Sequence, residues 1–461
     1  MSLLPNPSAP CLSAGMTFGI ELEFIVAFPK NYFNPEDAIA AISRALVAAG
    51  IDSTGHEKYD EDVEIFSNKP EFSQWTVKRE FGLFLSDTER AILNHRETST
   101  LGVEISSRKL SYAEDWKAEL QTVLMVLYNF NQSGVKLITN ATTGFHIHVG
   151  FGDGSVPLRT AKSVLQLCTA FEDHLDVLYA TDRIDVDCEA SADNGVHFNA
   201  GLSWHFQNNK VTDFGPNVFH WLVSIEEAKS HEQLGAFFKN LCSFDINLVT
   251  NAHYSTVNMD NLYMDGESIF CHFEPMGTIE FRQHHGTLVL SEIMAQIELK
   301  RTIVTWCHFA TDLQFLQLCS KVSDPEFILK SLCQAIGARP ELIQLYEDTF
   351  SAAAEHAEMI RYHTALATLA AGKSDELGDL ELQSSVKSYL RSNKTAVRNK
   401  IHDKRMNGTY ADLTTTAEKE FDVAQEYEWF IQMNSPYYEA QELATMARTM
   451  DFQQLNGSDY S

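Results

Sequence analysis

Ile20-Glu21-Leu22-Glu23-Phe24 alternates apolar residues with carboxylates, and two other short stretches of the chain alternate in the same way. They are Phe145-His146-Ile147-His148-Val149 and Ile279-Glu280-Phe281-Arg282. Residues i and i+2 of a β-strand point to the same face of a sheet, and the residue between them points to the other face. Each stretch is therefore predicted to be a strand that buries its apolar side and presents a polar pair. Together the three strands indicate one sheet whose polar face binds cations and a polyanion, as in an enzyme.

The composition is that of a folded protein, and the charge restricts its partners. The 461 residues allow two or three domains, and 44% hydrophobic residues are enough for a sizeable core. A formal charge of −28 argues against non-specific binding to nucleic acid or to anionic membranes. If a nucleotide binds, local Arg and Lys side chains and metal ions must overcome that negative background.

The sequence predicts a cytoplasmic protein. It has no run close to the ~18 consecutive apolar residues of a membrane-spanning helix. Residues 1–15 lack a basic segment followed by an apolar one, so we expect no signal peptide there. The eight cysteines are scattered without a CxxC pair, and we expect them to be reduced, buried thiols.

The pattern along the chain predicts an α+β catalytic domain followed by helices. Further strands are expected at 75–78, 101–106, 136–139, 254–263 and 269–282, and helices at 34–50, 111–130, 158–180 and 291–318. The helix at 111 is predicted from the capping-box pattern of Ser111 and Glu114. Residues 323–450 are helical in pattern, with an interruption near Gly337. We therefore expect a catalytic domain over 16–320 and a helical C-terminal region over 321–461.

The first polar pair is suited to metal ions. Glu21 and Glu23 would lie roughly 6–7 Å apart along one strand face, given the rise per residue. That spacing suits two neighbouring hard cations bridged by phosphate oxygens. The alternative is a solvated strand face without a ligand.

The second pair, His146 and His148, lies between Gly144 and Gly150, which permit a close approach of ligand or backbone. Imidazoles suit Mn²⁺ or Zn²⁺ and tolerate Mg²⁺ less readily. The alternative is that one of the two histidines makes only a structural hydrogen bond.

In the third pair, Glu280 would bind metal while Arg282 holds a phosphoryl group in transfer. A surface ion pair is the alternative, but the dense Gln-His-His-Gly-Thr stretch at 283–287 favours a site. Glu104, Lys78 and Glu80 would complete a ring of acidic ligands with basic residues at its rim.

Several familiar signatures are absent from the sequence. It contains no HExxH zinc helix and no GxSxG nucleophile turn. Gly372-Lys373-Ser374 is similar to the end of a phosphate-binding loop, but position 367 is Ala where that loop needs Gly.

At these motifs the chain resembles the amidoligase family of the glutamine-synthetase-like carboxylate–amine ligase superfamily. The resemblance covers residues 16–310 and keeps the family's order of motifs. The matching stretches are Phe18–Phe24, Trp75–Lys78, Gly102–Ser106, Thr143–Gly150, Tyr254–Asn258 and Thr278–Thr287.

The resemblance implies a curved, mainly antiparallel sheet that holds ATP and Mg²⁺ or Mn²⁺. A substrate carboxylate would be activated as an acyl phosphate and joined to an amine of a small molecule, amino acid or peptide. The implied metal ligands are Glu21, Glu23, Glu104, His146, His148 and Glu280. Arg282, Lys78 and Asn258 would bind the nucleotide, and Arg282, Glu280 and His284 would act in catalysis.

The chain also departs from the family pattern. It carries Glu80 where the family tends to have Asp, and Ser107 where Pro often follows the preceding Ser. Residues 181–250 match poorly, with Arg183 as the one plausible basic element. The resemblance therefore does not identify the residues of the acceptor pocket.

Other functions remain open from the sequence. A metal-dependent hydrolase could use two histidines and a glutamate around zinc, which leaves a coordination position for water. A different acyl or phosphoryl transfer on the same sheet would need the same motifs. A non-catalytic descendant that binds a nucleotide or a partner is the third alternative.

Overall fold

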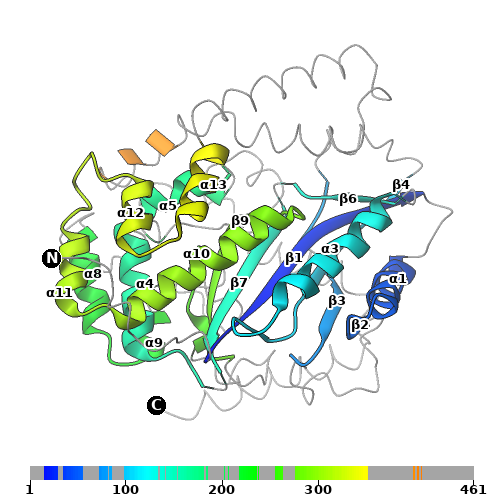
Figure 1. Ribbon diagram of the computed structural model, residues 1–461, viewed down its shortest axis with the longest axis horizontal. Coiled ribbons are helices and arrows are strands. Elements are labelled where there is room, and N and C mark those ends of the chain that lie inside the picture. Colours follow the sequence, from blue (N-terminus) through cyan, green and yellow to red (C-terminus); the bar gives the residue numbers. More distant parts are fainter. Residues whose placement is uncertain are drawn as a thin grey trace, which may run out of the picture.

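The computed structural model describes residues 15–29, 35–55, 72–80, 82–85, 98–132, 135–140, 142–152, 154–180, 183–184, 202, 206, 218–235, 237, 255–262, 276–350, 398–399, 402–403 and 406. These residues form a mixed α/β structure around one open, mostly antiparallel sheet (Figure 1). The predicted mixture of helices with a mainly antiparallel sheet is thereby confirmed.

The three strands predicted from alternation lie side by side in the sheet. They are β1 (Met16–Pro29), β7 (Gly144–Phe151) and β9 (Ile279–His285). The order is β2-β3-β4-β1-β7-β9-β8, in which only β2 and β3 run parallel among the described strands. The others are β2 (Ser53–Gly55), β3 (Trp75–Arg79), β4 (Thr98–Ser106) and β8 (Val257–Asn258), with β5 (Leu110–Ser111) and β6 (Lys136–Ile138) both paired to β1.

Strand β1 shows why the sequence forms a two-sided sheet. Phe18, Ile20, Leu22 and Phe24 are at most 2% exposed and belong to the main core. Glu21 and Glu23 point to the opposite face, as the period of two requires. Beyond Phe24 both faces are apolar, because Ile25 and Ala27 pack with Leu83, Leu85 and Ile138 in a second cluster.

Helices cover the apolar face of the sheet. α1 (Pro35–Ala48) packs on β2 and β3, α3 (Trp116–Gln132) on β6, and α10 (Leu290–Phe309) on β7. Figure 1 shows α3 and α10 lying across the sheet on the same side. α4 (Leu158–Ala170) packs on α10, and α8 (Val218–Glu227) and α9 (His231–Gly235) pack on α4, which extends the helical layer.

Three predicted helices were wrong in their bounds. The Ser111–Glu114 box closes a turn, in which the Ser111 N–H donates to Glu114 at 2.6 Å, and the helix begins later, at Trp116. Residues 158–180 divide into α4, α5 (Glu172–Leu175) and the 3-10 helix η2 (Asp176–Leu178). The helix predicted at 291–318 ends at Phe309, and Thr311 caps a separate helix, α11 (Asp312–Cys319), through a complete capping box.

The two strands predicted at 254–263 and 269–282 are paired but short. β8 contains only Val257 and Asn258, which lie opposite Phe281 and Glu280 of β9, and the 3-10 helix η6 (Asp260–Leu262) follows at once. The remainder of that predicted pair, 263–275, lies outside the described residues.

Two helices after residue 320 pack on the same core. α12 (Leu329–Ala335) and α13 (Pro340–Phe350) are separated at Gly337, whose φ of 81° ends the first helix as predicted. The Tyr346 hydroxyl donates to the backbone oxygen of Ala295 on α10 at 3.2 Å. The predicted domain boundary near 320 stays a prediction, and most of the helices predicted after 350 lie outside the described residues.

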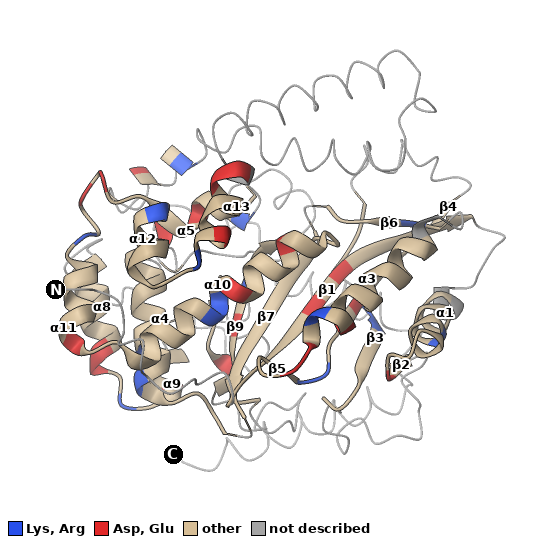
Figure 2. Cartoon of the chain, in the orientation of Figure 1, with Lys and Arg blue, Asp and Glu red and all other residues tan. Residues whose placement is uncertain are grey.

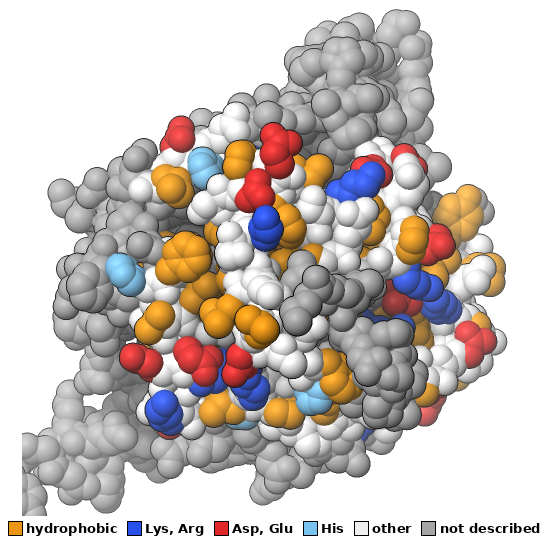
Figure 3. All heavy atoms as spheres, turned by 60° about the vertical axis from the view of Figure 1, so that its left-hand side comes forward, with side chains coloured by type: hydrophobic (Ala, Val, Ile, Leu, Met, Phe, Trp, Pro, Cys, Tyr) orange, Lys and Arg blue, Asp and Glu red, His pale blue; other side chains and the backbone are white. Residues whose placement is uncertain are grey.

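Several apolar side chains of the described residues are exposed on the side that carries α11 and α12. Figure 3 turns this side forward and shows apolar side chains interspersed with charged ones. Leu313, Leu316 and Ile328 are the strongly exposed apolar residues of this segment. Cys168, Cys307, Cys319 and Cys333 are buried free thiols, as predicted. Within the described parts of the chain, every helix is too short or too polar to cross a membrane.

Lys300 of α10 joins the helical layer to the sheet. It is 1% exposed, donates to Tyr179 Oη at 2.6 Å and to Gln283 Oε1 on β9 at 3.1 Å, and lies over the Phe281 ring. Burial lowers the pKa of Lys300 to about 8. The folded protein therefore carries this ammonium at a cost, because a charged group leaves water when it is buried.

Lys300→Met should remove a pH-dependent part of the stability. The unfolded lysine has a pKa of about 10.4, so between pH 8 and 10 the unfolded state binds more protons and native stability rises with pH. This rise would reach roughly 3 kcal/mol and would be absent from the variant, whose side chain fills similar space. Urea denaturation at several pH values measures it, and equal pH slopes in the two proteins would contradict it.

Candidate active site

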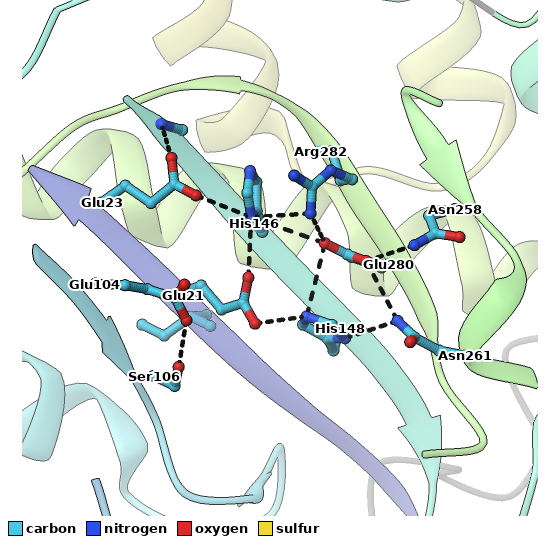
Figure 4. A network of polar contacts seen from close by, with 12 residues as sticks. Glu21, Glu23, Glu104, Ser106, His146, His148, Asn258, Asn261, Glu280 and Arg282 are labelled. Carbon is cyan, nitrogen blue, oxygen red and sulfur yellow. Dashed lines mark hydrogen bonds and ion pairs between the residues drawn. The ribbon is translucent and has the colours of Figure 1, made fainter. Parts of the chain in front are cut away.

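The register of the sheet brings the predicted polar residues together. Glu21 of β1 lies opposite His146 of β7, Glu23 opposite Glu104 of β4, and His148 opposite Glu280 of β9. Lys78 of β3 extends the row beyond Glu104, and Asn258 of β8 extends it beyond Glu280. Figure 2 shows the acidic positions on β1 and β9, and Figure 4 shows their side chains converging on one face.

At the centre, Glu21, His146 and Glu280 form a compact group. Each offers a ligand atom within 4.8 Å of the other two. Glu21 Oε2 lies 2.9 Å from His146 Nδ1, and Glu280 Oε1 lies 3.7 Å from the same nitrogen. Because all three donors come from paired strands, the backbone hydrogen bonds of the sheet hold their spacing.

His148 completes the centre from the next position on β7. Its Nε2 lies 3.3 Å from Glu21 Oε1 and 3.9 Å from Glu280 Oε1 (Figure 4). Burial would lower the pKa of His148, but Glu280 and Glu21 raise it above its ordinary value. Burial would raise the pKa of Glu21, but His148 and His146 hold it well below its ordinary range. The carboxylate is thus ionised and able to bind a cation.

Glu280 is held by three other side chains. Arg282, two residues along β9, donates to Oε1. Asn258 and Asn261 donate to Oε2 at 2.8 and 3.2 Å. Burial would raise the pKa of Glu280, but Arg282 and His148 lower it to about 2. The two amides fix the orientation of the carboxylate, so that Oε1 faces the centre of the cluster.

The opposite side of the cluster carries two more carboxylates. Glu23 accepts the backbone N–H of Gly144 at 2.6 Å, and it lies 3.7 Å from His146 Nδ1. Glu104 forms an ion pair with Lys78 at 2.9 Å and accepts the Ser106 hydroxyl at 2.5 Å. Burial and the nearby Glu21 raise the pKa of Glu104 to about 8. A cation bound on this side would lower that pKa, because it would stabilise the ionised form of Glu104.

Glu80 lies next to the same side. Its Oε1 accepts the Gly82 N–H at 3.0 Å, and burial together with Glu23 raises its pKa. Glu80 thus adds a carboxyl group to the side that carries Glu23 and Glu104, with Lys78 beside Glu104.

The structure places His284 elsewhere. Its Nδ1 lies 2.7 Å from the backbone oxygen of His285, and its ring packs edge-on against Phe145 and Tyr179. It belongs to a second group with His285 and Glu292. The β7–β9 register shifts between Phe145 and Ile147, which breaks the alternation of faces, so His284 does not share the face of Glu280 and Arg282.

Sequence reasoning missed several supporting residues. Asn261, Ser106 and Thr278 contact Glu280, Glu104 and His148 respectively. Asn261 lies in η6, three residues after Asn258 of β8. That spacing was the one feature of the sequence that could have placed the two amides near each other. The role of the Gly144 N–H depends on register, which the local sequence does not encode.

The donor set fits a divalent cation. Carboxylate oxygens with one or two imidazoles suit Mn²⁺, and the excess of carboxylates also suits Mg²⁺. The donor atoms of Glu21, His146 and Glu280 lie within 4.8 Å of one another, so one ion could contact all three. A cation placed among them would offset the repulsion between Glu21, Glu23 and Glu104.

A family model matches part of the chain. Residues 14–190 match the family model described as "putative amidoligase enzyme", which confirms the resemblance to the amidoligase family. The matched stretch includes β1, β4 and β7, whereas β8 and β9 lie beyond it. No curated protein matches the chain.

Among solved structures, the chain is similar to a bifunctional glutathione synthetase from Pasteurella multocida. The sequence identity is 11% and the TM-score is 0.35, and the alignment covers 84% of this chain and 53% of the synthetase chain. The chain thus spans about half the length of that protein.

Asn258→Ala should lower the affinity for Mn²⁺ roughly 10- to 100-fold, because residues that orient a ligand have effects of that size. The fold should persist, since Asn258 lies on a two-residue strand at the edge of the sheet. Calorimetric titration of Mn²⁺ measures the affinity, and circular dichroism checks the fold. Gln344→Ala, on the exposed face of α13, is the control. Unchanged affinity would mean that Asn258 does not orient Glu280.

Proposed function

We propose that the protein is an ATP- and metal-dependent ligase that forms an amide between a carboxylate and an amine. The amidoligase family match over residues 14–190 supports the general class of carboxylate–amine ligase. The observation that carries the proposal is the buried row of carboxylates and imidazoles, with Arg282 beside Glu280 and His146 (Figure 4) and Lys78 paired with Glu104. Such a face binds a metal–nucleotide complex, in which cations lie between protein carboxylates and phosphates.

The proposed metal ligands are those expected from the sequence, with Glu21, His146 and Glu280 at the centre. His148, Glu23 and Glu104 surround them within the same face. Mg²⁺ or Mn²⁺ bound here would neutralise charge on phosphate oxygens. Asn258 and Asn261 would keep Glu280 turned toward the ion, and the Gly144 N–H would do the same for Glu23.

Arg282 is proposed to bind the phosphoryl group that is transferred. In the structure it donates to Glu280, and Nη1 lies 3.4 Å from His146 Nδ1, so its guanidinium already faces the cluster. It is 8% exposed, and electrostatic attraction is strong where water is excluded. Lys78 is proposed to neutralise phosphate charge at the other end, where it now pairs with Glu104.

The reaction proposed is transfer of the γ-phosphoryl group to the substrate carboxylate, followed by displacement of phosphate by the amine. The protein's part is to align the two substrates and to stabilise charge. We propose small-molecule, amino-acid or peptide substrates in a cytoplasmic protein, with no part for nucleic acid or membranes. The catalytic role expected of His284 is not included, because its contacts place it with His285 and Glu292.

A zinc-dependent hydrolase is the second candidate. His146 Nδ1 and His148 Nε2 both lie within 4 Å of Glu280 Oε1, at 3.7 and 3.9 Å. Two histidines and a glutamate with an open position form a catalytic zinc arrangement. Glu21, Glu23 and Glu104 exceed what one zinc ion needs, which favours the nucleotide–metal proposal. A non-catalytic descendant that binds a nucleotide would retain the same ligands.

Calorimetric titration of ATP into metal-free protein, with and without Mg²⁺ or Mn²⁺, separates these functions. ATP binding that requires the metal supports the ligase and justifies a screen of acids and amines for ADP release. Tight binding of one Zn²⁺ without any ATP binding would favour the hydrolase. Metal-dependent ATP binding with no ADP release for any acid–amine pair would favour the non-catalytic descendant.

Glu21→Gln and Glu280→Gln should each abolish metal-supported nucleotide turnover and leave the fold intact. Each replaces an ionised ligand by a neutral amide of equal size, so the cation loses a charged donor. ADP release with Mg²⁺ or Mn²⁺ measures the effect. Glu347→Gln, an exposed residue of α13, is the matched control and should keep full turnover. Normal turnover in either site variant would remove that residue from the metal centre.

Arg282→Ala should weaken ATP binding at least 10-fold while changing Mn²⁺ binding in the absence of nucleotide only slightly. The guanidinium attracts phosphate and repels a cation, so its loss affects the two ligands differently. Two calorimetric titrations, one with Mn²⁺ alone and one with ATP and Mn²⁺, measure this difference. Arg301→Ala on α10 is the control, and an unchanged ATP affinity would make Arg282 a structural residue.

A further inference from the structure

A second group of metal-binding side chains lies at the junction of β9 and α10. It consists of His284 and His285 at the end of β9 and Glu292 in the first turn of α10. Their ligand atoms lie within 4.8 Å of one another. This group shares no residue with Glu21, His146 and Glu280, so it would bind its own ion.

The two histidines are brought together by an irregular backbone. Adjacent residues of a regular strand point to opposite faces, yet the rings of His284 and His285 stack with centroids 4.2 Å apart. The β7–β9 register shifts between Phe145 and Ile147, close to the Phe145–His284 pair. Gly286 then donates to the Thr143 oxygen at 2.8 Å, and a Cβ at Gly286 would lie 2.1 Å from Thr143 Oγ1. Glycine is therefore required here, and the bend that joins the rings is built into the fold.

Hydrogen bonds orient the ligands of this second group in advance. His284 Nδ1 lies 2.7 Å from the backbone oxygen of His285, so Nδ1 carries the proton and Nε2 keeps the lone pair that can bind a metal ion. The Thr287 hydroxyl donates to Glu292 Oε2 at 2.7 Å and also accepts the Val289 N–H at 3.2 Å. His285 Nε2 lies 3.7 Å from that same Glu292 oxygen. Oriented histidine and carboxylate ligands of this kind are typical of metal sites.

We propose that His284, His285 and Glu292 bind a zinc-class transition-metal ion that fixes the end of β9 to the start of α10. Two imidazoles and one carboxylate suit Zn²⁺ or Co²⁺, whereas Mg²⁺ prefers oxygen ligands. The histidines are 4% and 3% exposed, and the Glu292 side chain is 20% exposed, so an ion would enter past the carboxylate. The site is structural and does not depend on the proposed ligase function. It would hold the segment that follows Arg282.

The test measures Zn²⁺ retained after dialysis by the full-length protein and its variants, together with the visible spectrum of the Co²⁺ form. Glu292→Gln keeps the size of the side chain and an acceptor for Thr287. It should lower the affinity for one Zn²⁺ ion per chain at least 10-fold. His285→Asn should have the same effect and serves if Glu292→Gln fails to fold. Glu347→Gln is the control and should retain all bound zinc.

Glu280→Gln separates this site from the proposed active site. Glu292→Gln should lose one equivalent of Zn²⁺ and the corresponding Co²⁺ spectrum, and Glu280→Gln should keep both. The inference is overturned if Glu292→Gln and His285→Asn both retain all bound zinc. It is also overturned if Glu280→Gln loses the same equivalent, because one shared site would then account for the metal. Loss of ATP binding in Glu280→Gln alone tests the ligase proposal and leaves this one standing.

Discussion

Repulsion between carboxylates on one buried sheet face is the constraint on which the rest of the structure depends. β1, β4 and β9 contribute the four acidic side chains Glu21, Glu23, Glu104 and Glu280. Like charges this close are costly where water is excluded. The chain offsets that cost with Arg282 beside Glu280, Lys78 beside Glu104, and the two histidines between them. Each of these side chains is placed by strand register, so the sheet and its electrostatics depend on one another.

The separation of polar from apolar surface makes this arrangement possible. On the helical side, Phe18, Ile20 and Leu22 are almost completely buried. The hydrophobic free energy of their burial offsets the repulsion between the carboxylates on the other face. Lys300 is the exception on that side, an ammonium held by Tyr179 and Gln283. Proteins commonly retain such unfavourable groups near functional sites, where the surrounding packing compensates for them.

The strands of the site could be predicted from the sequence because their signal is local. A period of two in apolar residues identified β1, β7 and β9, and the polar pairs on them identified the site face. Register is a non-local property, so the position of Glu23 opposite Glu104, or of Asn261 beside Glu280, could not be predicted. The position of His284 could not be predicted for the same reason. The register shift between β7 and β9 places its ring against Phe145 and away from Glu280 and Arg282. The Thr311 cap that divides α10 from α11 is local, yet a continuous apolar pattern obscured it.

The central position of β1 has a consequence for how the chain is made. β1 is translated first among the described strands. Its partners β4 (98–106) and β7 (144–151) come later, and β9 (279–285), which pairs with β7, comes later still. Synthesis takes place at ~5–20 residues per second, so many seconds separate the synthesis of β1 from that of β9 and α10, which complete the sheet and its helical layer. Long-range pairing of this kind also slows folding. The nascent chain therefore needs protection until about two thirds of it has been made.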